Sequence, residues 1–302
     1  MGPLKDINIL EFSGIGPGPY CGMLLADMGA NVIRICRKDS EGLENKFDIH
    51  NRSKRSMTAN LKNGNTIKEI LKLIDQVDVV FEGYRPGVME KLGLGPDICL
   101  ERNPKLVYGR MTGWGQEGPM SNLAGHDINY ISLSGALHAI GRKDSNPIPP
   151  LNLVADYGGG SMFLIFGILA ALYERALSGK GQTIDAAMVD GVPAMMGLFH
   201  QQIAKGSWTD GERQSNLLDG GAPFYRCYEC SDGKFISVGA LEPQFFAELV
   251  EIVKLPEIDL VTQNDRTTWA EKNKAYEKIF KSKSRDEWSK IFEGTDACVT
   301  PI

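Results

Sequence analysis

The first 110 residues alternate between short apolar stretches and stretches with helical periodicity, and this alternation restricts the fold more than any other feature. Strands that alternate with helices form parallel sheets, because each crossover helix returns the chain to the edge where the previous strand began. The sequence therefore predicts an α/β unit. Its expected elements are strand 7–12, helix 20–28, strand 31–35, helix 66–74, strand 79–81, helix 88–92 and strand 106–109.

The second half of the chain predicts a different kind of unit. Residues 161–177 are apolar on nearly every side, which is typical of a buried helix. A β-hairpin with a Ser-Asp-Gly turn is expected within 223–240, followed by helices at 243–254 and 267–280. We therefore expect a large α/β domain at 1–190, a helical linker at 191–214 and a small α+β domain at 215–302. A chain of 302 residues is long enough for two such cores.

Charge and apolar patterning argue against a nucleic-acid or membrane partner. The net charge is -5, and no block of Lys or Arg creates the positive field that such surfaces need. The longest apolar run, 162–172, is shorter than the roughly 18 residues of a membrane span. Six scattered cysteines are typical of reduced thiols inside a cell. Cys227 and Cys230 form a CxxC within a strand pattern, and we expect neither a zinc site nor any other metal site there.

A glycine-rich loop follows the first strand, as in dinucleotide-binding proteins. The third glycine of that motif would fall on Pro19, and the second strand ends with Arg34 and Arg37, where an acidic ribose ligand is expected. The loop therefore does not predict NAD binding.

Several cations follow the predicted parallel strands, at the edge where open α/β sheets bind ligands. Such cations suit a ligand with several phosphates, but a solvated basic face explains them equally well, and the spacing leaves both interpretations open. These cations are Arg37, Arg52, Lys54, Arg55, Lys62 and Arg85.

Two residues are candidates for acid/base chemistry. His126 lies beside a loop, and Asp156 follows an apolar stretch and precedes three glycines, in what we expect to be a loop before the long helix. His50, His138 and His200 lie in contexts that favour structural roles.

Several phrases, in one order along nearly the whole chain, closely resemble the α-methylacyl-CoA racemases of the class III CoA-transferase superfamily. The phrases are EGYRPGVMEKLGLGP at 82–96, GRMTGWGQEGP at 109–119, LAGHDINYISLSG at 123–135, PPLNLVADYGGG at 149–160, GKGQTIDAAMVDG at 179–191, LDGGAPFY at 218–225 and VGALEPQF at 238–245. The resemblance implies a Rossmann-like large domain with a parallel sheet, a smaller α+β domain and an interlocked homodimer. It also implies a further C-terminal segment that this sequence lacks, and a location in the cytoplasm of a bacterium or in mitochondria or peroxisomes of a eukaryote.

The resemblance also implies a chemistry, the interconversion of (2R)- and (2S)-2-methylacyl-CoA thioesters. His126 and Asp156 would be the two acid/base residues, and Glu242 would orient His126. No cofactor is expected, because coenzyme A is part of the substrate. The implied CoA contacts are Arg37, Ala59, Asn60, Leu61, Lys62, Gly83, Tyr84, Arg85, Lys91, Gly125, Asp127, Ile128, Asn129 and Tyr130.

Two other functions stay open on the sequence. In a CoA transferase of the same superfamily, Asp156 would be a nucleophile, and His126 would have no evident task. A CoA-thioester carrier without catalysis would use the cations but would not explain His126, Asp156 and Glu242 together. His126 favours the racemase.

Overall fold

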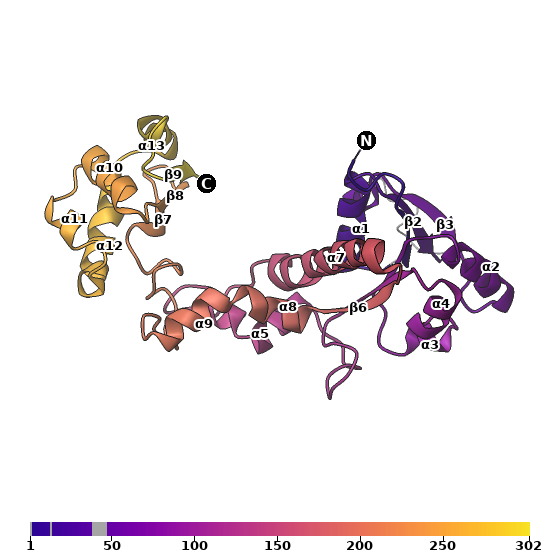
Figure 1. Cartoon of the computed structure of the whole chain (residues 1–302). Helices are drawn as coiled ribbons and strands as arrows, with labels where there is room; N and C mark the ends of the chain where they lie inside the picture. Colours follow the sequence, from indigo (N-terminus) through magenta and orange to yellow (C-terminus); the bar gives the residue numbers. More distant parts are fainter. Residues whose placement is uncertain (1, 13, 38–46) are drawn as a thin grey trace. The chain divides into compact units, whose positions relative to one another are not determined.

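The computed structural model describes residues 2–12, 14–37 and 47–302. The chain forms two compact units, Met1–Leu137 with Pro149–Gly197, and His138–Ile148 with Leu198–Ile302 (Figure 1). The first unit ends slightly later than the predicted large domain, and the segment 138–148 within it groups with the second unit. Each unit has its own apolar core and is described separately.

The first unit contains a six-stranded, fully parallel sheet in the order β3-β2-β1-β4-β5-β6. This is the doubly wound order of Rossmann-like folds, so the predicted fold class is confirmed. The edge strand β3 did not show in the sequence, because its four residues are mostly exposed and lack an apolar pattern. The strands are β1 (Asn8–Phe12), β2 (Asn31–Cys36), β3 (Arg55–Thr58), β4 (Val79–Glu82), β5 (Val107–Thr112) and β6 (Gln182–Ala187).

Helices connect these strands, and apolar side chains cover both faces of the sheet. Consecutive strand residues point to opposite faces, so that Ile9 belongs to one core cluster and Leu10 to the other. The helical elements are α1 (Pro17–Asp27), η2 (Ile49–Asn51), α2 (Gly64–Ile74), α3 (Val88–Lys91), α4 (Pro96–Arg102), α5 (Asp127–Leu133), α6 (Ala136–Ala139), the π-helix η3 (Leu153–Met162), α7 (Phe163–Ser178) and α8 (Met188–Met195).

The long apolar helix α7 is buried on one face only. Leu164 and Ile168 are fully buried where α7 packs on β5 and β6, whereas Phe166, Tyr173 and Leu177 are 73–75% exposed. The prediction that this helix is buried on every side is therefore wrong, because the face with Phe166, Tyr173 and Leu177 is exposed. Together, η3 and α7 are the one stretch among the described residues that is long and apolar enough to span a membrane, a test that core helices of soluble proteins also pass.

The second unit is built on a small antiparallel sheet with the strand order β7-β8-β9, which confirms the predicted hairpin. Aromatic side chains such as Phe224, Tyr228 and Trp288 fill its core. Cys230 is buried, Cys227 is exposed, and both are free thiols. The elements, with α9 leading into this unit, are α9 (Gly197–Ala204), β7 (Tyr225–Glu229), β8 (Phe235–Gly239), α10 (Pro243–Val253), α11 (Ile258–Val261), α12 (Arg266–Phe280), α13 (Arg285–Phe292) and β9 (Val299–Pro301).

A buried ion pair joins the first strand to the segment before β3. The ammonium of Lys54 lies 2.6 Å from the Glu11 carboxylate, both side chains are at most 2% exposed, and Lys54 also donates to the carbonyl of Pro19 at 2.9 Å. Burial raises the pKa of Glu11 to about 7, although Lys54 and Arg34 both lower it. The Cα of Gly22 faces this pair, where an added Cβ would lie 2.0 Å from a Glu11 oxygen. The pair therefore fixes α1 against β1.

Lys54→Met should lower the free energy of unfolding by about 3–5 kcal/mol at pH 8, because it leaves the Glu11 carboxylate buried without its counter-charge. The loss should shrink at pH 5, where a carboxyl with a pKa near 7 binds a proton and becomes neutral. Urea unfolding at both pH values measures this. The matched control is Lys72→Met, in an exposed pair with Glu69, which should change stability by no more than about 0.5 kcal/mol. Equal effects of the two substitutions would contradict the prediction.

Candidate active site

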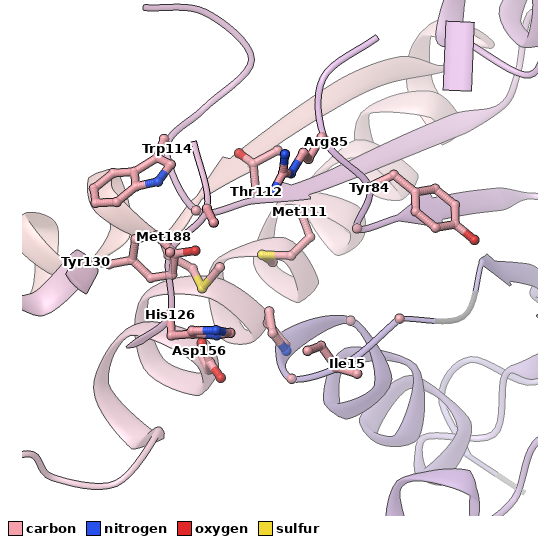
Figure 2. A pocket seen from close by; sticks show the side chains of 18 of the residues that line it. Ile15, Tyr84, Arg85, Met111, Thr112, Trp114, His126, Tyr130, Asp156 and Met188 are labelled. Carbon is pink, nitrogen blue, oxygen red and sulfur yellow. The ribbon is translucent and has the colours of Figure 1, made fainter. Parts of the chain in front are cut away.

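A cavity of about 540 Å³ opens at the carboxyl edge of the parallel sheet. The chain leaves β1 toward one side and β4 toward the other, and ligands of doubly wound sheets bind in the crevice that this creates. The segments after β1, β4 and β5 form its walls, together with the loop before α5 and the first turn of η3 (Figure 2). The two acid/base candidates meet here. The lining includes Gly14, Ile15, Gly16, Gly83, Tyr84, Arg85, Thr112, Trp114, Gly125, His126, Tyr130, Asn152 and Asp156.

His126 stands immediately before α5, with an exposed side chain that faces the cavity (Figure 2). Its backbone is extended, and its N–H donates to the side-chain oxygen of Asn129 at 3.0 Å. Asn129 is the third residue of α5. Its side chain reaches back to the residue before the helix and accepts this hydrogen bond, as in a capping box. This local contact fixes where the imidazole leaves the backbone.

Asp156 lies within the π-helix η3, so the prediction that it lies in a loop is wrong. Glycines at 158–160 concealed the helix in the sequence, because glycine disfavours helix interiors. Asn152 donates to the carboxylate at 3.3 Å, and an added Cβ on Gly16 would lie 3.0 Å from the same oxygen. Asn152 was missed, although its spacing of four residues from Asp156 was visible.

The electrostatic surroundings of Asp156 favour its neutral form. Burial raises the pKa of its carboxyl, the amide of Asn152 lowers it, the carboxylate of Asp127 raises it, and the imidazole of His126 lowers it. The pKa of Asp156 lies above its ordinary value as a result. His126 and Asp156 lie beside each other in the cavity.

Tyr130 is a buried aromatic residue in the lining of the cavity. Its ring meets Trp114 edge-to-face at 4.7 Å between centroids, and burial raises the pKa of its hydroxyl to about 12, with Asp156 and Asp127 adding to the effect. Side chains at Gly113 and Gly125 would collide with this ring, since their added Cβ atoms would lie 2.3 and 2.8 Å from it. Tyr130 is therefore a neutral, closely packed wall.

Some of the residues expected to contact CoA follow the parallel strands β2, β3 and β4 at one edge of the sheet. Cys36 pairs with Thr58, so Arg37 and the segment 59–62 begin side by side. Tyr84 and Arg85 line the cavity, and Arg37 is close enough to lower the pKa of Tyr84, which burial raises. The role of every expected CoA contact stays a prediction. Arg37 lies outside the lining of this cavity, and so do eight further expected contacts. They are Ala59, Asn60, Leu61, Lys62, Lys91, Asp127, Ile128 and Asn129.

Three of the cations that left the phosphate interpretation open are engaged by the protein itself. Lys54 forms the buried pair with Glu11, Arg52 binds Asp27 at 2.5 Å, and Arg55 donates to Asn31. For these three residues the structure favours a structural role.

Two further expectations concern residues outside the cavity. Glu242 precedes α10 in the second unit, and its expected proximity to His126 stays a prediction. Within residues 2–12, 14–37 and 47–302, no group of three His, Cys, Asp or Glu side chains is arranged to hold a metal ion.

Comparisons with known proteins identify the family. Residues 4–302 match CoA-transferase family III, and the chain belongs to this family. It is 46% identical to α-methylacyl-CoA racemase of Mus musculus and 45% identical to that of Homo sapiens, over 99% of this chain and 77% of each relative. A CaiB/BaiF family protein from Brucella suis has the same fold, with a TM-score of 0.82 at 24% identity over 100% of this chain and 84% of that one.

Asp156→Asn should stabilise the protein at pH 7. The folded state raises the pKa of this carboxyl, so the wild type loses stability as pH rises from the unfolded value of 3.8 through the folded value, and the uncharged amide does not. The advantage should vanish below pH 3.8. Urea unfolding at pH 7 and pH 3.5 tests this, with the exposed Asp97→Asn as the control. A destabilised Asp156→Asn protein at pH 7 would refute it.

Proposed function

We propose that this protein interconverts the (2R) and (2S) forms of 2-methylacyl-CoA thioesters by removing and returning the proton on the α-carbon. The observation that carries the proposal is that His126 and Asp156 line the same cavity at the carboxyl edge of the sheet. The racemase names of the mouse and human relatives support it. Inversion needs a base on one face of the α-carbon and an acid on the other, because one side chain cannot easily reach both faces.

The two residues divide this work according to the hand of the substrate. In one direction His126 takes the α-proton, the electron pair moves onto the thioester oxygen as an enolate, and Asp156 returns a proton to the opposite face. In the other direction the roles reverse. The raised pKa of Asp156 supports its part, because a carboxyl that is neutral nearer to working pH has a proton to give.

The enolate oxygen needs a hydrogen-bond donor between the two residues. The backbone N–H groups at the start of α5, at Asp127 and Ile128, have no acceptor within the helix and follow His126 directly. A donor of this kind contributes about 3–4 kcal/mol to the transition state of related reactions. In this proposal CoA enters with the substrate, its phosphates lie near Arg37, Lys62 and Arg85, and no separate cofactor takes part.

CoA transfer is the second candidate function, and the family to which the chain belongs includes such enzymes by its description. There the Asp156 carboxylate would attack the thioester carbonyl, release the CoA thiolate and form a mixed anhydride. This chemistry gives His126 no task, although its side chain faces the same cavity. His126 therefore favours the racemase.

We further propose that two copies of the chain associate through α7. Phe166, Tyr173 and Leu177 lie on one face of this helix and are 73–75% exposed. An apolar stripe of this length is typical of a surface that another protein covers. A homodimer buries it without a further partner.

Incubation of one hand of a 2-methylacyl-CoA in deuterated water tests the reaction. Deuterium should enter the α-carbon while the sample approaches an equal mixture of the two hands. His126→Ala and Asp156→Ala should each lower racemisation by at least about 100-fold, because general acid and base catalysis commonly contributes that much. Asp97→Asn, at an exposed acid on α4, serves as the control. Transfer of CoA to an added carboxylic acid without deuterium uptake would replace this proposal with the transferase.

Phe166→Glu should shift the protein toward monomer, because it places a charge in the proposed contact. Sedimentation velocity at several concentrations measures this. Glu174→Gln, at an exposed position on the same helix, should leave the assembly unchanged. A wild type that is monomeric at all concentrations would exclude the dimer.

A further inference from the structure

We propose that the side chain of Asp127 is a positioning residue, which holds the backbone at Asp156 in place beside His126. The inference rests on the proposed function and adds to it a part for a side chain that the reaction as described does not use. Asp127 directly follows His126 in sequence, yet its contacts are with the turn that carries the other acid/base residue. It is therefore a physical link between the two.

The link consists of two short hydrogen bonds. One carboxyl oxygen of Asp127, Oδ2, accepts from the backbone N–H of Ala155 at 2.7 Å and from that of Asp156 at 2.8 Å. The N–H groups in the first turn of a helix have no acceptor within the helix, and here Asp127 supplies one from a different element. Asp127 is 5% exposed, so water does not compete strongly for these donors. The first turn of η3 is thereby tied to the start of α5.

The second oxygen of the same carboxylate has a different consequence. Oδ1 of Asp127 is buried and has no hydrogen-bond partner among the residues that the structure describes. No hydrogen-bond donor among the described residues therefore offsets the negative charge at this oxygen. Among the residues that the structure describes, Asp127, His126 and Tyr130 are the charged and titratable groups that interact with Asp156. Burial raises the pKa of Asp156 most, the charge of Asp127 raises it further, and His126 lowers it. The positioning residue thus also favours the protonated form of Asp156.

Both effects act on the same step. Proton transfer to and from carbon requires the acid and the base at fixed places on either side of the α-carbon, and an error of about 1 Å can cost about 100-fold in rate. Asp127 fixes the backbone of one residue relative to the helix that begins beside the other. A group that merely completed a helix cap would change the stability of the protein but not its kcat, which separates the two interpretations experimentally.

Two substitutions in the full chain test the proposal. Asp127→Asn keeps an oxygen acceptor for the two N–H groups but removes the charge, so Asp156 should titrate at lower pH. Asp127→Ala removes the acceptor as well, so kcat for racemisation should fall by at least tenfold with a change in KM of less than about threefold. Carboxyl ¹³C NMR of the protein labelled at aspartate reports the titration, and the signal lost in Asp156→Asn identifies Asp156. The Asp185 carboxyl, whose pKa burial also raises, should titrate unchanged.

The pH profile gives a second reading of the same effect. For the hand of substrate from which Asp156 takes the proton, the acidic limb of kcat should move to lower pH in Asp127→Asn, because the base stays ionised further into acid. Asp97→Asn should leave both the profile and the Asp156 titration as in the wild type. An unchanged Asp156 titration in Asp127→Asn overturns the proposal, and so does a wild-type kcat in Asp127→Ala.

The outcomes remain distinct if one experiment fails. Should Asp127→Ala not fold, the titration in Asp127→Asn decides alone. The NMR titration needs no turnover. A wild type that does not racemise would therefore overturn the proposed function, whereas the effect of Asp127 on the titration of Asp156 would still be decided by the NMR measurement.

Discussion

The parallel pairing of β1 with both β2 and β4 is the constraint on which the rest of the structure depends. The next two segments of the chain return on one side of β1, and later segments return on the other, so the connections diverge above its carboxyl end. Nothing in the sheet fills that point, and a cavity forms there. Segments that are distant in sequence, after β1, β4 and β5, line it because their strands end at one edge.

The π-helix η3 brings Asp156 to this cavity, and the glycines that follow Asp156 make its packing possible. An added Cβ on Gly159 would lie 2.9 Å from Val192, and one on Gly191 would lie 2.0 Å from the carbonyl oxygen of Gly159. The two backbones therefore touch where η3 crosses α8, and no larger residue fits. Such π-helical turns occur frequently at functional sites, where they place a side chain that a regular helix would turn away.

Carboxylates inside the first unit occur in two different arrangements, either paired with a cation or next to another carboxylate. Glu11 with Lys54, and Glu82 with Arg110, pair inside the sheet region and leave little charge for a ligand. Asp127 and Asp156 lie close together, and the pKa of Asp156 is raised first by burial and then by the charge of Asp127. The first arrangement joins separate segments of the fold through paired charges, whereas the second places two carboxylates near each other, which favours a proton on Asp156. Burial alone does not distinguish a structural carboxylate from a reactive one, but the partner does.

The sequence by itself determined the parallel α/β unit, the hairpin of the second unit and the candidacy of His126 and Asp156. Apolar periodicity and turn residues act over short distances, and they are written directly in the chain. Tertiary structure decided the rest. The exposed strand β3 forms because β2 provides a free edge for pairing. The helix around Asp156 contains glycines because its backbone packs in direct contact with α8, where a larger residue would not fit. Lys54 pairs with Glu11 and is not a ligand-binding cation. The bond from Asp127 to the backbone of Asp156 joins positions 29 residues apart, and only folding brings them together.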